Sequence, residues 1–262
     1  LSGAYRWFSE VLELVGVESQ SWSFAKAIGG QEGFFEFAEE ALARLDTGIV
    51  GLLGESTSLE ALPRNATLEN AMSSLNDDEV MTLVLDRASG DYGFEVITVS
   101  KVDGRLAAER MKTLHRMPDG KLRAFNLSSE SSGTQRLLGL LPMLFELVGD
   151  GGRAGSKVFV VDELDRCFHT MLTARLIEDF TAGCNAATRK QLLFTTHDLL
   201  LMDQHLMRRD EMFIAQRAAD GCSELIGLAE FEGIRFDKDL VRSYLDGRFG
   251  GIPMLGEEKA HG

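Results

Sequence analysis

The chain has 262 residues, of which 44% are hydrophobic and 26% are charged, so it can form one large domain or two small ones around an ordinary apolar core. Its net charge of −14 disfavours direct binding of nucleic acid or of an anionic membrane by the chain as a whole. The three cysteines form no CxxC pair, which favours reduced thiols in a cytosolic protein over a disulfide framework or a zinc site.

The first hundred residues predict helices that are separated by polar breaks. We expect one helix over 7–15 and a second over 33–45, where phenylalanine, alanine and leucine recur at helical spacing. A short apolar run at 49–53 then predicts a strand. The alternating, β-branched segment at 94–100 predicts another strand, which would end in a tight turn at 103–104.

The next segment predicts a hairpin, a loop and an apolar helix. Residues 111–117 and 121–127 would pair across a Pro-Asp-Gly turn. A loop rich in serine and glycine follows at 128–134, and a helix is expected over 135–148. The apolar stretch within it is about a dozen residues long, which is too short to span a bilayer, so we expect no membrane partner.

After a glycine-rich connection at 149–155, strands and helices alternate. We expect strands over 157–163 and 191–196, with a helix over 171–180 between them. The first of these strands is a continuous apolar run, as expected of a strand that is buried on both faces. This order predicts a crossover connection and an α/β fold, with a mostly parallel sheet flanked by helices.

The change of character along the chain also predicts its domain organisation. The portion 1–127 would be helical and antiparallel, and 128–255 would form the lobe that carries the parallel sheet, with a flexible tail at 256–262. Within the second lobe we expect a helix at 199–206, then short strands and a last helix over 238–245.

Two carboxylates end the first strand of the predicted parallel sheet. Asp162 and Glu163 directly follow four apolar residues, and a buried strand delivers its last residues to the sheet edge where α/β proteins bind ligands. There one carboxylate can hold Mg²⁺ through water, and the next can polarise the water that attacks a γ-phosphate. The alternative interpretation is a strand that ends in two solvated acids.

Two further signals accompany this pair. His197 follows the next apolar strand, where a neutral imidazole could contact a γ-phosphate; a helix-capping histidine is the alternative. Backbone amides and small hydroxyls that can bind an anion open the apolar helix, and the alternative there is a plain N-cap without a ligand. The residues of this opening are Ser131, Ser132, Gly133, Thr134 and Gln135.

The loop, the carboxylate strand and the histidine strand occur in the order that ABC ATPases use. Segments such as ESSGTQRLL, VFVVDELDRCFHTMLTARLIEDF and QLLFTTHDLLLMD make the chain similar to the C-terminal half of AAA-type ATP-binding proteins with ABC-like heads. Such heads resemble those of the structural-maintenance-of-chromosomes proteins and Rad50, and the group includes anti-phage defence ATPases. The resemblance implies a P-loop-NTPase-like fold of the ABC type, with ATP and Mg²⁺ as cofactors.

The resemblance also implies roles for single residues. Asp162 would organise Mg²⁺, Glu163 would be the general base, and His197 would be the switch residue that senses the γ-phosphate. The run from Ser131 to Gln135 would be the signature loop that closes over ATP held by a second subunit, and Asp165 would lie in the loop that links two such sites. A homodimer through the ATPase heads follows from this arrangement.

The sequence contains no G-x-x-x-x-G-K-[ST] motif, and the glycine-rich segments at 51–57 and 149–157 do not supply one. We therefore expect a C-terminal part of a longer cytoplasmic ATPase, inactive without its P-loop, that would switch an effector protein or a nucleic-acid-associated complex. The alternative hypothesis is a non-hydrolytic dimerisation module with a degenerate nucleotide site. A nuclease is not supported, because no further cluster of metal-ligating acids accompanies Asp162 and Glu163.

Overall fold

The structure, a computed structural model, describes residues 2–16, 20–45, 47–62, 66–86, 94–148, 156–185, 188–217, 220–232 and 239–252. The chain divides into two compact units, residues 1–168 with 179–195 and residues 169–178 with 196–262. The boundary predicted at 127/128 falls inside the first unit, and the predicted connection at 149–155 and tail at 256–262 lie outside the described residues. No helix within these ranges has the length and apolar character needed to cross a lipid bilayer.

The chain begins with helix α1 (Ser2–Arg6), a π-helical turn η1 (Trp7–Val11) and strand β1 (Leu12–Val15). The helix predicted over 7–15 is therefore wrong in its second half. Strand β1 pairs in parallel with β7 (Lys157–Val161), with Val15 beside Val161. Four residues are too few to show a helical or a strand period, so the pairing with a distant strand decides their structure.

A parallel sheet in the order β1-β7-β8 carries the predicted site. Strand β8 (Lys190–Phe194) pairs with β7 in parallel, and helix α6 (Thr170–Gly183) connects the two strands, which confirms the predicted crossover. Phe159 and Val161 of β7 are fully buried on one face of this sheet. The strand predicted over 157–163 ends at Val161, so the two carboxylates follow it.

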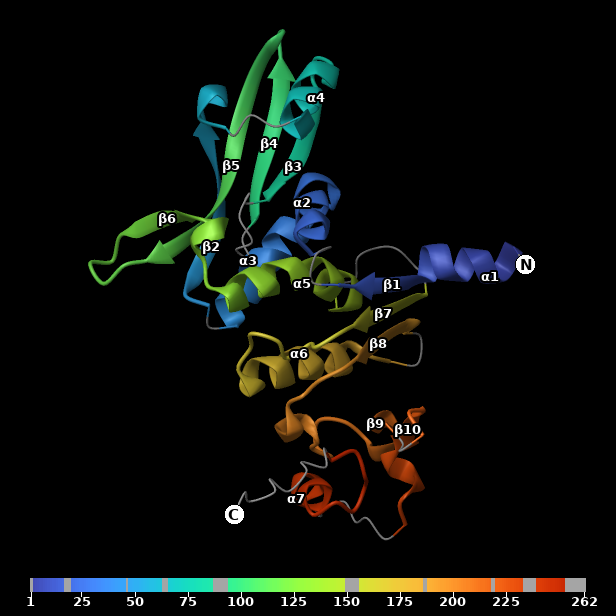
Figure 1. Ribbon diagram of the computed structural model, residues 1–262. Coiled ribbons are helices and arrows are strands. Elements are labelled where there is room, and N and C mark those ends of the chain that lie inside the picture. Colours follow the sequence, from blue (N-terminus) through green and yellow to red (C-terminus); the bar gives the residue numbers. More distant parts are fainter. Residues whose placement is uncertain are drawn as a thin grey trace, which may run out of the picture. The chain divides into compact units, whose positions relative to one another are not determined.

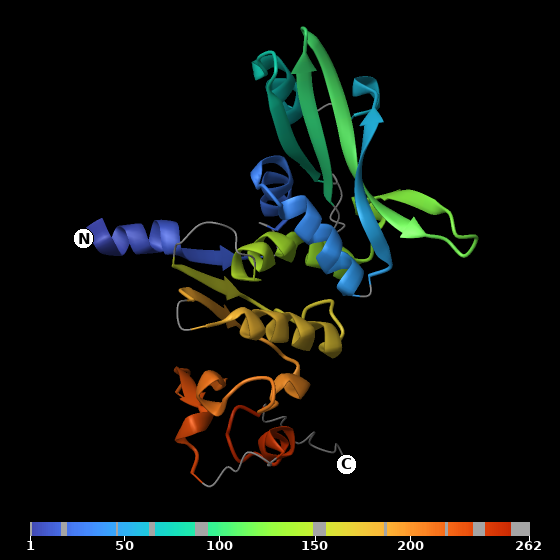
Figure 2. The same ribbon diagram turned by 180° about the vertical axis from the view of Figure 1, so that it is seen from behind.

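The first unit also contains an antiparallel sheet of five strands in the order β2-β5-β4-β3, with β6 beside the end of β5. The predicted strands at 49–53 and 94–100 and the predicted hairpin are confirmed, whereas the sequence did not predict β3. The strands are β2 (Ile49–Thr57), β3 (Val80–Asp86), β4 (Phe94–Val102), β5 (Arg105–Arg116) and β6 (Leu122–Asn126). The hairpin of β5 and β6 projects from the side of this sheet (Figures 1 and 2).

Four helices complete the first unit. Helix α4 (Ala66–Ser74) contributes Leu68 to a core that it shares with the antiparallel sheet. Helices α2 (Gln20–Gly30) and α3 (Phe34–Arg44) pack against α5 (Ser132–Val148), which both views place between the antiparallel and parallel sheets (Figures 1 and 2). The helix predicted over 33–45 is thereby confirmed as α3.

Helix α5 runs antiparallel to β7. Near its C-terminal end, Glu146 lies 3.9 Å from the Lys157 Nζ at the start of β7, and the Leu147 carbonyl accepts a hydrogen bond from the Lys190 Nζ at the start of β8. At its other end, Arg136 reaches the residues that follow β7. The first turn of α5 consequently lies at the carboxyl end of the parallel sheet, the edge at which open α/β sheets bind ligands.

The second unit is built from short elements around its own core. Met212, Ile214, Leu228, Leu240 and Phe249 form this core. This unit contains the first part of α6, up to residue 178. Its other elements are the 3₁₀ turns η4 (Leu199–Leu201), η5 (Arg209–Glu211) and η6 (Leu228–Glu230), strands β9 (Phe213–Arg217) and β10 (Ser223–Gly227), and helix α7 (Leu240–Leu245). The short strands predicted for this region are confirmed as an antiparallel pair.

Two predicted helices of the second unit differ from the structure. The helix expected over 199–206 stops at Leu201, because the Asp203 carboxylate accepts a hydrogen bond from the His205 amide at 2.8 Å and so favours a turn. The helix expected over 238–245 is observed as α7 from Leu240, capped by Asp239, and residue 238 lies outside the described residues.

We expect the two faces of the parallel sheet to respond differently to truncation. Phe159 has no exposed surface, so Phe159→Ala should lower the free energy of unfolding by about 3–5 kcal/mol. Leu193, in the adjacent strand, is 62% exposed, and Leu193→Ala should change it by less than about 1 kcal/mol. Urea unfolding of both variants measures this difference, and equal losses would contradict the assignment of the buried face.

Candidate functional site

The two predicted carboxylates lie in the turn that follows β7. Asp162 is exposed and Glu163 is half-buried. Glu163 has a φ angle of +48°, in the left-handed region that residues with a side chain rarely occupy. Such a conformation costs about 1–2 kcal/mol, and it persists only where neighbouring groups hold it in place. Contacts from the residue after β8 and from α5 hold this turn.

Thr195, the first residue after β8, holds the carboxylate turn through its hydroxyl group. Its Oγ1 donates a hydrogen bond to the Asp162 Oδ1 at 2.5 Å and accepts one from the Glu163 amide at 2.8 Å. Its own amide donates to the Val161 carbonyl, and its carbonyl accepts from the Leu164 amide, each at 3.0 Å. The end of β8 is thus tied to the carboxylate turn on both sides of the acidic pair.

Arg136, in the second turn of α5, holds the same turn from the other side. Its Nη2 donates to the carbonyl oxygens of Asp162 at 3.2 Å and Glu163 at 2.6 Å. The side chain is buried, and its Nε and Nη1 have no hydrogen-bond partner among the described residues. Burial lowers the pKa of the Arg136 guanidinium, an effect that the nearby Glu163 and Asp165 oppose. The guanidinium remains a cation, because arginine does not lose its proton in proteins.

The turn continues through Asp165 to Cys167. Arg166 lies 3.6 Å from the Glu163 carboxylate, and Leu164 is almost fully buried, which anchors the turn to the core. Asp165, predicted to contact nucleotide, is half-buried, and its Oδ1 has no hydrogen-bond partner among the described residues. Cys167 has a φ angle of +67°, so the turn contains a second residue in the left-handed region.

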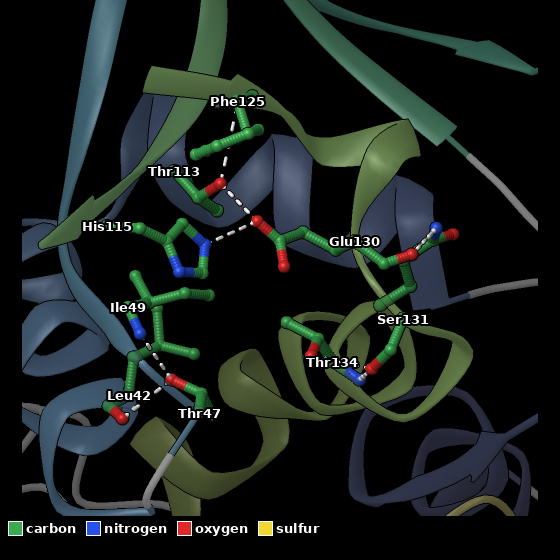
Figure 3. Close-up of polar contacts among 10 residues, drawn as sticks. Leu42, Thr47, Ile49, Thr113, His115, Phe125, Glu130, Ser131 and Thr134 are labelled. Atoms are coloured by element: carbon green, nitrogen blue, oxygen red, sulfur yellow. Dashed lines mark hydrogen bonds and ion pairs between the residues drawn. The ribbon is translucent and has the colours of Figure 1, made fainter. Parts of the chain in front are cut away.

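The predicted signature loop is partly helical. Helix α5 begins at Ser132, so the expectation that 128–134 is a loop is wrong for Ser132, Gly133 and Thr134, which form the first helical turn. Ser131 caps this turn, since its Oγ accepts from the Thr134 amide at 3.1 Å and lies 2.9 Å from the Thr134 Oγ1 (Figure 3). The Gln135 side chain is buried and donates to the Glu130 carbonyl at 2.8 Å.

Glu130 ties this first turn to strand β5. Its carboxylate, whose side chain is only 9% exposed, accepts hydrogen bonds from the Thr113 hydroxyl and, at 2.8 Å, from the His115 Nε2 (Figure 3). Thr113 is fully buried, and the His115 ring contacts Phe125 of β6 edge to face. A buried carboxylate needs such partners, because an unpaired one would be strongly destabilising. These contacts therefore hold Glu130, the residue that precedes the cap Ser131, in place.

Gly133 brings the start of α5 into contact with the carboxylate turn. A Cβ atom placed on Gly133 would lie 2.7 Å from the carbonyl oxygen of Cys167, closer than real Cβ atoms approach. Only glycine allows this approach. The structure thus brings together, within the first unit, the predicted signature residues and the turn that carries Asp162 and Glu163.

His197 belongs to the second unit and is exposed. Its neighbour Asp198 caps η4 by accepting from the Leu200 amide at 3.0 Å, and it also accepts a hydrogen bond from the Thr170 hydroxyl. The predicted capping function in this segment is therefore carried by Asp198. The switch function of His197 stays a prediction.

The residues present fit a magnesium ion that is held jointly with a ligand. The described residues contain no group of three or more His, Cys, Asp or Glu side chains that could hold a metal. Mg²⁺, however, prefers oxygen ligands and is commonly bound by one or two carboxylates together with substrate phosphates. The exposed Asp162 carboxylate, oriented through its Oδ1 by Thr195, offers such a ligand.

The sequence did not single out three residues that shape this site. Thr195 stands in the quoted FTTHD segment, but only its neighbour His197 carries a predicted role. Arg136 and Glu130 flank the predicted signature residues without having been assigned a function. The available signal in the sequence was weak: an arginine beside an apolar run, and a glutamate directly before two serines.

Comparison with protein families finds a match over most of the chain. The family described as "AAA domain, putative AbiEii toxin, Type IV TA system" matches residues 22–203. The match covers more than half of the chain and includes Asp162, Glu163 and His197, together with the start of α5. A search of curated proteins finds no match.

The close approach at Gly133 predicts a steric penalty. Gly133→Ala should lower the free energy of unfolding by about 1–3 kcal/mol, because the new methyl group overlaps the Cys167 carbonyl. Gly183→Ala is the matched control, since a Cβ there meets nothing within 4 Å and alanine favours a helix. Thermal unfolding compares the two variants, and a neutral Gly133→Ala would contradict the approach.

The buried carboxylate of Glu130 predicts a second loss of stability. Glu130→Gln keeps the shape but removes the negative charge, so the hydrogen bonds from Thr113 and His115 to the Oε1 become weaker and the free energy of unfolding should fall by about 1–3 kcal/mol. Glu69→Gln, on the exposed side of α4, should change it by less than about 0.5 kcal/mol. Urea unfolding tests both, and equal effects would argue against the Glu130 network.

Proposed function

The chain belongs to this AAA domain family, and we propose that it supplies the hydrolytic carboxylates and the signature residues of an ABC-type ATPase site. The family supports ATP binding and hydrolysis in general terms. The ABC-type arrangement, with ATP bound between two copies of the head, is our proposal for how this chain takes part. The best support is the joint position of the acidic turn and the start of α5 at the carboxyl end of the parallel sheet.

The proposed chemistry assigns different roles to the two carboxylates. Glu163 would accept a proton from the water that attacks the γ-phosphate, and Asp162 would orient the metal ion through its carboxylate. When bound, Mg²⁺ would neutralise charge on the β- and γ-phosphate oxygens. Arg166 forms an ion pair with the Glu163 carboxylate at 3.6 Å.

The first turn of α5 is the proposed contact to ATP held by a second copy. The N-terminus of a helix attracts anions, since its first amides lack partners within the helix and its dipole is positive there. Ser132 is exposed at this end, beside the capping pair of Ser131 and Thr134. No lysine-bearing phosphate loop occurs among the 262 residues, so the proposal assigns the main phosphate contacts to a segment outside them.

The biological role proposed here is a switch that acts on an effector or on a nucleic-acid-associated complex. The description of the family includes the words "putative AbiEii toxin, Type IV TA system", and we propose a role in anti-phage defence. Hydrolysis would drive the change between an ATP-joined and a separated pair of heads. The acidic character of the chain favours a protein partner over direct contact with nucleic acid.

The proposal is tested by removing the general base. In the product of the gene that encodes this chain, Glu163→Gln should lower kcat for ATP hydrolysis by at least about 100-fold while ATP binding is kept. The control Glu178→Gln alters an exposed carboxylate of α6 and should leave kcat unchanged.

Two measurements decide the outcome. Phosphate release gives kcat, and analytical ultracentrifugation with ATP reports whether Glu163→Gln accumulates as a nucleotide-bound dimer. Equal and negligible turnover in the natural protein and in Glu163→Gln would contradict the proposal and would instead favour a non-hydrolytic dimerisation module.

A further inference from the structure

We propose that Thr195 is the positioning residue of this site, acting through one hydroxyl group that sets both the Asp162 carboxylate and the backbone at Glu163. The proposal rests on the proposed function for what the two carboxylates do, whereas the contacts themselves stand independently of it. Thr195 would touch neither nucleotide nor attacking water. Its effect would pass entirely through the acidic pair.

The backbone of Thr195 bonds to the residues on either side of the acidic pair, and its hydroxyl contacts the pair itself. Its amide and carbonyl are engaged by Val161 and Leu164, the residues that immediately precede and follow the two acids. These bonds continue the pairing of β8 with β7 beyond the last ladder residue. The backbone bonds therefore hold the Thr195 hydroxyl next to the Asp162 carboxylate and the Glu163 amide.

The chemistry at this position requires a group that donates and accepts through the same atom. The Asp162 Oδ1 needs a donor at 2.5 Å, and the Glu163 amide needs an acceptor at 2.8 Å. A hydroxyl does both, since it has one proton and two lone pairs. Valine has nearly the same shape but neither function, and serine keeps both functions without the γ-methyl group that restricts threonine at χ1.

The left-handed conformation of Glu163 makes the amide contact consequential. With a φ angle of +48°, this residue tends to return to the ordinary β or helical regions, which would turn its carboxylate in another direction. Arg136 holds the carbonyl of Glu163, and Thr195 holds its amide. Removing the hydroxyl takes away the hydrogen bond to the Glu163 amide, whereas the hydrogen bonds to the Glu163 carbonyl remain.

The first arm of the test needs no nucleotide. Amide hydrogen exchange at Glu163, followed by NMR, should be about tenfold faster in Thr195→Val than in the natural chain, because the amide loses its acceptor. Thr195→Ser should keep the natural rate to within about twofold. Thr188→Val is the matched control before the other end of β8, where Thr188 accepts a hydrogen bond from the Asn185 amide, and it should leave Glu163 unchanged.

The second arm uses ATP hydrolysis by the product of the gene. Groups that orient a metal ligand typically affect metal affinity or activity by about 10–100-fold, so Thr195→Val should raise the half-saturating Mg²⁺ concentration at least about tenfold. The KM for ATP at saturating Mg²⁺ should stay within about twofold, and Thr195→Ser should restore the natural Mg²⁺ dependence.

The two arms separate failure of this inference from failure of the proposed function. Unchanged exchange at Glu163 in Thr195→Val, or an unchanged Mg²⁺ dependence in an active enzyme, would overturn the role of Thr195. A natural protein without ATP turnover would overturn the proposed function, and the exchange arm would then decide the role of Thr195 alone. Equal thermal stability of the Val and Ser variants establishes that both are folded.

Discussion

Helix α5 has to be covered on every side, and the first unit is organised around this requirement. Its buried residues point in all directions around the helix axis, and such a helix is stable in water only when other elements enclose it. Helices α2 and α3 pack against it, and its ends are tied to the parallel sheet. Because α5 is antiparallel to β7, the same packing places its first turn beside the acidic residues that follow β7.

The fold was predictable where hydrophobic runs were long or bounded by clear turns. Strands β7 and β8 and the helix between them follow from apolar runs, and the β5–β6 hairpin follows from its Pro-Asp-Gly turn. Strand β1 was not predictable, because its four residues acquire their structure from a partner strand far away in the sequence. The short turn at Leu199–Leu201 was mistaken for a helix because apolar spacing does not show that Asp203 favours a turn.

Of the residues that make up this candidate site, the sequence indicates the acidic pair and the start of α5. A strand that ends in Asp162 and Glu163 shows directly in the sequence, since a strand end at a parallel-sheet edge is a common ligand position. The residues that hold this pair act through single hydrogen bonds between distant segments, which leave no periodic pattern. The left-handed backbone at Glu163 has no sequence sign either, because glutamate, unlike glycine or asparagine, does not favour that region.

The anchoring of Glu130 to Thr113 and His115 bears on which parts of this protein can be exchanged between relatives. Strand β6 separates the end of β5 from the start of α5 in the sequence, and the buried carboxylate of Glu130 joins the two. Recombination that carried only α5 into another background would separate this acid from its partners. The β5–β6 hairpin and the start of α5, which follow one another in the sequence, would therefore have to be exchanged together.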